Sequence, residues 1–146
     1  MANSFLGRND EAIAAMRSVV EGQIGRLGAN HPYTLISHSD LGGMLSKGGY
    51  FHEAVDVLAP AYAQAMESHG AGHFSTLMVG YNFSEALGGS GQHKRALVVL
   101  SGIAEEGAIA FPEGHQWGAR VELMFGKLAV YREDWSAAVD LSLIHI

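Results

Sequence analysis

The sequence predicts an all-α protein built from stacked helix hairpins of similar sequence. The main observation is an exact 42-residue period, which two residue types keep: Ala12, Ala54, Ala96 and Ala138, and His31, His73 and His115. A fixed period of about 20–50 residues indicates repeated units that bury their apolar faces by stacking. Within each unit, apolar residues recur at steps of three and four, which is the spacing of a helix face, and no alternating strand pattern is present.

Composition restricts the class of protein further. The chain has 146 residues, of which 48% are hydrophobic and 16% charged, so a packed core is expected instead of disorder. A net charge of −6 argues against a nucleic-acid partner, which would need a clustered basic face. The chain has no cysteine, no secretory leader and no apolar run near the ~20 residues that span a bilayer. We therefore expect a soluble, cytoplasmic protein with no membrane partner.

The first helices follow from local signals. A helix at about residues 9–26 is expected as the second half of a unit whose first half is missing. The next helix begins near Asn30-His31-Pro32, where Asn30 or His31 can cap the helix and proline occupies its first turn. It ends at Ser46-Lys47-Gly48-Gly49, because glycine can adopt the left-handed conformation of a helix end. Its partner helix is expected to continue to about Ser68.

The remaining units repeat this pattern. Helices are expected near residues 74–88 and 93–110, and then near 116–130, with the start of another helix near Asp134. The period-related alanines mark points where two helix axes approach closely. Pro60 conflicts with its helical surroundings, since proline inside a helix costs about 3 kcal/mol. We expect a kink there or a late start of that helix.

The first complete unit resembles a known repeat family. Its residues 27–35, then Leu41 and Leu45, then Gly49-Tyr50-Phe51-His52-Glu53-Ala54, are similar to the 42-residue tetratricopeptide repeat of the kinesin-light-chain type. The resemblance covers residues 6–140. The array that it implies occupies residues 1–140, with a partial unit at 1–28, units at about 29–70 and 71–112, and a truncated unit at 113–140. It implies helix hairpins that form a right-handed superhelical solenoid, whose concave face binds peptide segments.

The resemblance also implies a binding surface on the first helix of each hairpin. Residues four apart share one helix face, opposite the packing face. The implied peptide-binding residues are Ser39, Asp40, Gly43 and Lys47 in the first full unit, Tyr81, Asn82 and Glu85 in the second, and Leu123, Lys127 and Tyr131 in the third. Among them, Asn82 matches the asparagine of the family that hydrogen-bonds a ligand backbone. With Asp40 and Glu85 in this surface, a basic clamp for a terminal carboxylate is not expected.

The expected function is therefore a scaffold that binds a protein or peptide partner, with no catalysis of its own and no cofactor. The alternative is a regulatory sensor array of a larger signalling or transcription-control protein. Self-association through the open ends of the array is a further expectation. The recurring histidines suggest a metal ladder, but stacked units lie roughly 10 Å apart, which favours helix caps over shared metal ligands. We thus expect no metal site.

Both ends of the chain depart from the repeat pattern. A stable array needs a complete unit or a polar capping helix at each end, and neither is evident here. The segment 141–146 does not follow the residue pattern of the repeat and resembles the translation of a sequencing-adapter end. We expect this segment to be non-native and the chain to be a fragment of a longer repeat protein.

Overall fold

The computed structural model describes the backbone of residues 2–144 and the side chains of residues 7 and 9–134. It contains α1 (Ala2–Leu27), α2 (Pro32–Lys47), α3 (Phe51–His69), α4 (Phe74–Gly89), α5 (His93–Ala110) and α6 (Gln116–Ile144). No strand occurs in the described backbone. The all-α prediction is confirmed, and the bounds of α2 to α5 agree with the expected ranges to within about two residues, which is the usual uncertainty of a helix end.

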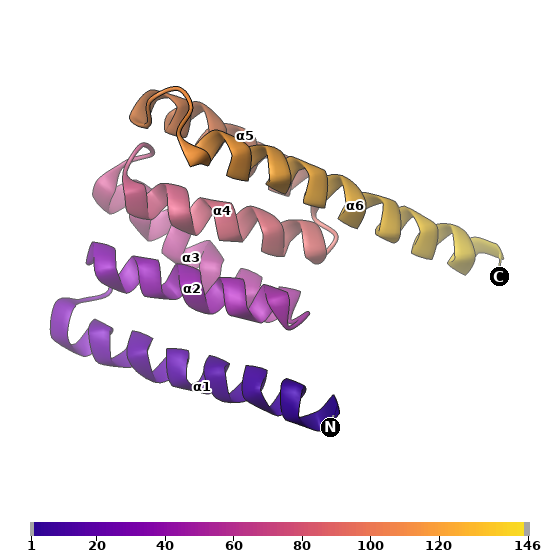
Figure 1. Ribbon diagram of the computed structural model, residues 1–146, viewed down its shortest axis with the longest axis horizontal. Helices are drawn as coiled ribbons and strands as arrows, with labels where there is room; N and C mark the ends of the chain where they lie inside the picture. Colours follow the sequence, from indigo (N-terminus) through magenta and orange to yellow (C-terminus); the bar gives the residue numbers. More distant parts are fainter. Residues whose placement is uncertain (1, 145–146) are drawn as a thin grey trace.

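The helices form two layers. In the first layer, α2 packs on α4 and α4 packs on α6. Figure 1 shows these three helices side by side, with α3 and α5 behind them. Helix α3 packs on both α2 and α4, and α5 packs on both α4 and α6, whereas α1 packs on α2. Each helix of the second layer thus bridges two helices of the first, so that α2, α4 and α6 present one common face.

Small residues allow the two layers to approach closely. Ala54 and Ala96 are completely buried, as the period predicts. Gly42 in α2 lies directly against Leu58 in α3, where a Cβ atom would overlap the leucine side chain. Ala12 is exposed, because α2 is the one described helix that packs on α1 and it does not cover that side of α1. The predicted close approach is therefore wrong at Ala12, and the side chain of Ala138 lies outside the described residues.

Three helices begin with a histidine cap. The ring Nδ1 atoms of His31, His73 and His115 accept hydrogen bonds from the backbone N–H groups of Tyr33, Ser75 and Trp117, each at 3.1 Å. A cap of this kind satisfies one of the N–H groups that the first turn of a helix leaves unpaired. The prediction that these histidines recur as helix caps is confirmed.

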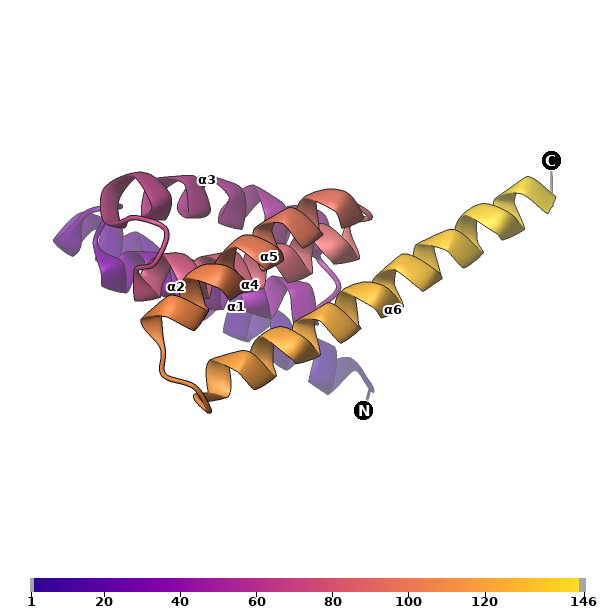
Figure 2. The same ribbon diagram turned by 90° about the horizontal axis from the view of Figure 1, so that it is seen from above.

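The predicted break before Asp134 is wrong, because α6 continues without interruption to Ile144. In the two earlier units, the turn after the first helix depends on Gly49 and Gly91, whose φ angles are +84° and +91°. The third unit has Glu133 at this position, and a residue with a Cβ atom rarely adopts such a φ angle. The carboxyl-terminal part of α6 therefore extends beyond the other helices, as Figure 2 shows.

Helix α3 contains Pro60 in its interior. It begins at Phe51 and ends at His69, so the alternative of a late helix start is wrong. Pro60 is exposed, and so is Asp56 one turn before it. Because proline has no N–H group, the carbonyl group of Asp56 loses its helical partner at a place where water can replace it.

No helix in the described part of the chain is both long enough and apolar enough to span a membrane.

Candidate functional site

A groove of about 520 Å³ lies on the common face of α2, α4 and α6. Eight of the ten predicted binding residues line it: Ser39, Asp40, Gly43, Lys47, Tyr81, Asn82, Glu85 and Lys127. Leu123 and Tyr131 do not. The Leu123 side chain is 68% exposed outside the groove, and the ring of Tyr131 instead packs edge-on against Phe51 with 5.5 Å between the centroids.

At the centre of the groove, Asn82 links α4 to α2 by hydrogen bonds. Its Nδ2 atom donates hydrogen bonds to the carbonyl oxygen of Ser39 at 3.0 Å and to the Ser39 hydroxyl at 2.8 Å. The same hydroxyl donates to the carbonyl oxygen of Met78 at 2.9 Å. Both amide hydrogens of Asn82 thus serve to join α4 to α2. Only its Oδ1 atom, a hydrogen-bond acceptor, remains for a ligand.

An ion pair joins α4 to α6 further along the groove. The Lys127 ammonium group donates to Glu85 Oε2 at 3.2 Å, and Glu85 is 8% exposed. Burial, the largest single influence, lowers the pKa of Lys127, but the charge and hydrogen bond of Glu85 outweigh it and raise the pKa above its ordinary value. The pair neutralises the buried carboxylate, so Glu85 adds little net negative charge to the groove.

The remaining charges in the groove are Asp40, Lys47 and Arg120. Burial raises the pKa of Asp40, and no ion pair to it occurs among the described side chains. Arg120 is exposed and was missed by the sequence analysis. Arg120 occupies in the third unit the position that Ile36 occupies in the first. This position lies eleven residues before the position of Lys47. Eleven residues correspond to about three helical turns, or roughly 16 Å along one helix.

Part of the groove lining is apolar. This part includes five residues that the resemblance does not assign: Met16, Ile36, Met44, Phe74 and Met78. Met16 comes from α1, so a helix outside the common face of α2, α4 and α6 also contributes to the lining. Phe74 is 51% exposed, so its ring offers apolar contact area to a ligand. Methionine side chains are flexible and adapt to differently shaped apolar groups.

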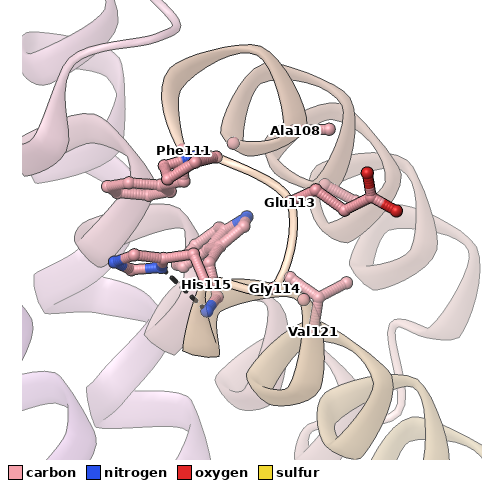
Figure 3. Close-up of a pocket in the computed structure, with 11 residues that line it drawn as sticks. Ala108, Phe111, Glu113, Gly114, His115 and Val121 are labelled. Carbon is pink, nitrogen blue, oxygen red and sulfur yellow. Dashed lines mark hydrogen bonds between the residues drawn. The ribbon is translucent and has the colours of Figure 1, made fainter.

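A second hollow, of about 380 Å³, lies at the loop between α5 and α6 (Figure 3). The rings of Phe111 and His115 stack there with a centroid distance of 4.3 Å. The hollow forms where the period is broken, since Pro112 replaces the glycine of the earlier loops and the positive φ angle moves to Gly114. The Nε1 atom of Trp117 is buried beside Gly107 without a hydrogen-bond partner. Because that atom is covered, it offers no accessible donor to a ligand.

His69 and His73 are engaged in structural contacts. His69 Nε2 lies 2.7 Å from the carbonyl oxygen of Asn30, and the His69 ring stacks on that of His73 with 4.8 Å between the centroids. Within the described residues, no three His, Asp or Glu side chains are grouped so that they could hold a metal ion.

The chain matches no protein-family model, no curated protein and no solved structure. The groove and the repeat itself are therefore the features from which a function is inferred.

Proposed function

We propose that this chain is a protein-interaction module of the tetratricopeptide-repeat type, whose helix hairpins follow a right-handed superhelical path. Its groove binds an extended peptide segment of a partner protein, without catalysis of its own and in the cytoplasm. The observation that carries the proposal is that eight residues from three separate units line one groove of about 520 Å³. That volume lies within the range of about 300–1,000 Å³ typical of ligand sites.

The chemistry of the groove supports a peptide ligand. An extended peptide offers backbone N–H groups, and the free Oδ1 atom of Asn82 and the carboxylate of Asp40 are acceptors for them. The apolar part of the lining, which includes Met44, Met78 and Phe74, can receive an apolar side chain of the same segment. The groove thus combines apolar contact area with a few polar groups that fix orientation, as binding sites generally do.

Selection of peptides from a random library, followed by affinity measurement, tests the proposal. Gly43 lies in the middle of the groove, and a Cβ atom there would be 3.4 Å from the Asn82 side chain. We expect Gly43→Gln to fill the groove and weaken the selected peptides at least about tenfold, or 1.4 kcal/mol. The matched control is Gly102→Gln, because Gly102 lies exposed in α5 with nothing within 4 Å of an added Cβ atom.

The control variant should bind the selected peptides as the native chain does. Both substitutions replace a helical glycine by a better helix former, so a change in helix propensity affects them equally. If the peptides bind Gly43→Gln and the native chain with the same affinity, or if the library yields no binder, the groove is not a peptide site.

A further inference from the structure

A cationic hollow lies outside the groove, at the amino-terminal end of α5. Its volume is about 650 Å³. Most of its lining comes from the turn before α5 and from the first residues of that helix. Helix α6 contributes a single side chain. The lining residues are Gly91, Gln92, His93, Lys94, Arg95, Leu97 and Arg132.

The hollow concentrates positive charge in an acidic chain. The sequence has 9 Lys and Arg residues against 15 Asp and Glu residues. Three of those nine, Lys94, Arg95 and Arg132, line this one hollow, and no described Asp or Glu does. Glu133 and Asp134 follow Arg132 in α6, but residues one and two apart on a helix do not share a face. The peptide-binding groove, in contrast, mixes its cations with Asp40 and Glu85.

The cations of the hollow are not used in ion pairs. The two ion pairs among the described side chains join Arg17 to Glu53 and Lys127 to Glu85. Arg95 is nevertheless held in place, since its Nη1 atom donates to Gln92 Oε1 at 3.3 Å. Its guanidinium carbon also lies 5.3 Å from the centroid of the Phe83 ring. A guanidinium group fixed on one side keeps further N–H donors for a ligand.

His93 provides an independent sign of an unsatisfied site. Both of its ring nitrogens are buried, and neither has a hydrogen-bond partner within the described residues. Buried polar atoms are normally paired, and an unpaired one costs about 1–3 kcal/mol. Both atoms are covered, so the His93 ring would have to rotate before it could donate to an anion held by Lys94, Arg95 and Arg132.

We propose that the hollow between α5 and α6 binds a phosphate monoester. Two guanidinium groups and one ammonium group supply more positive charge than a single carboxylate needs, and arginine matches the geometry of phosphate oxygens. The hollow is much larger than a phosphate group, and Leu97 with the aliphatic parts of the basic side chains can contact an organic substituent. This site shares no residue with the groove, so it does not depend on the proposed peptide binding.

The test is a titration at constant ionic strength, monitored by the NMR chemical shifts of the backbone amides. The three probes are phenyl phosphate, inorganic phosphate and acetate. We expect saturable shifts at Lys94, Leu97 and Arg132, with half-saturation at about 1–10 mM for phenyl phosphate. Inorganic phosphate should bind more weakly, and acetate should give no saturable shift. Absence of saturation with phenyl phosphate at about 20 mM, or shifts centred on the groove residues, would overturn the proposal.

A matched pair of arginine variants identifies the site. Arg132→Gln should weaken phenyl phosphate about two- to fivefold, the effect of removing one exposed ion pair. Arg26→Gln removes the same charge from the end of α1, where the arginine only donates to the carbonyl oxygen of Gly22, and should leave the affinity unchanged. Equal weakening in both variants would mean that only the net charge matters and would refute the site.

Discussion

Helices α4 and α6 stand one 42-residue period apart, and yet only α4 is enclosed by neighbours. Helix α4 packs on α2, α3, α5 and α6, whereas α6 packs on α4 and α5 alone. The difference is visible at equivalent positions: Phe83 in α4 is 3% exposed, and Phe125 in α6 is 37% exposed. The same residue type at the same place in the repeat is thus core in one unit and surface in the next. Burial in this fold is set by the neighbouring helices more than by the local sequence.

The largest expected effect is a difference in stability between alanine substitutions of these two phenylalanines. Phe83→Ala should lower the free energy of unfolding by about 3–5 kcal/mol, because it leaves a cavity in the core. Phe125→Ala should lower it by about 1 kcal/mol or less, since its side chain is already partly in water. Urea-induced unfolding of both variants measures the difference. Similar losses in the two variants would show that α6 is covered as fully as α4.

A smaller effect concerns the tie between α4 and α2. Asn82→Ala should lower the free energy of unfolding by about 1–3 kcal/mol, because the carbonyl group of Ser39 loses a donor. Asn82→Asp keeps the size of the side chain but cannot donate to that carbonyl, so it should be destabilised as well. A stable Asn82→Asp variant in the same unfolding measurement would show that the donated hydrogen bonds contribute little. Peptide affinity in these variants must therefore be measured well below the unfolding transition.

The smallest expected effect concerns the reason that α6 continues as one helix instead of ending in a turn near residue 133. The double change Arg132→Ser and Glu133→Gly recreates the Ser90-Gly91 pair that ends the corresponding turn after α4. A glycine inside a helix costs about 1 kcal/mol, and here it also permits the positive φ angle that Gly91 adopts. We expect helical Cα chemical shifts to be lost around residue 133. The control, Ala129→Gly, has the same cost in helix propensity within α6 and should leave those shifts helical. Equal behaviour of both variants would contradict the role of the missing turn glycine.

Much of the fold follows from signals that stand in the sequence itself. Histidine caps locate the starts of α2 and α4, and glycines with positive φ angles follow the ends of α2, α3 and α4, because each is a local interaction of a few neighbouring residues. The end of α6 could not be found by extending the period, since the decisive residue, Glu133, breaks it. Local chemistry was the better guide at that point, and the loss of the turn glycine was the available signal.

The site was only partly predictable. Residues at matching positions of α2 and α4 reached the groove, whereas Leu123 and Tyr131 of α6 did not. Arg120 and Phe74 were missed because they lie outside the positions that the resemblance assigns. The ion pair of Glu85 with Lys127 spans one whole period, so the repeat contained a signal for it. The use of the Asn82 amide hydrogens within the protein could not be read from the sequence, since it depends on the distance between α2 and α4.

The contact between Ser39 and Asn82 has a consequence for the energetics of recognition. It fixes the width of the groove before any ligand arrives, because it anchors the backbone of α2 to a side chain of α4. In the proposed function, a partner segment meets walls that need no rearrangement, so little conformational entropy of the receptor is lost on binding. The entropic penalty falls mainly on the flexible partner, and a stiffened or cyclic form of that segment should bind more tightly with the same contacts.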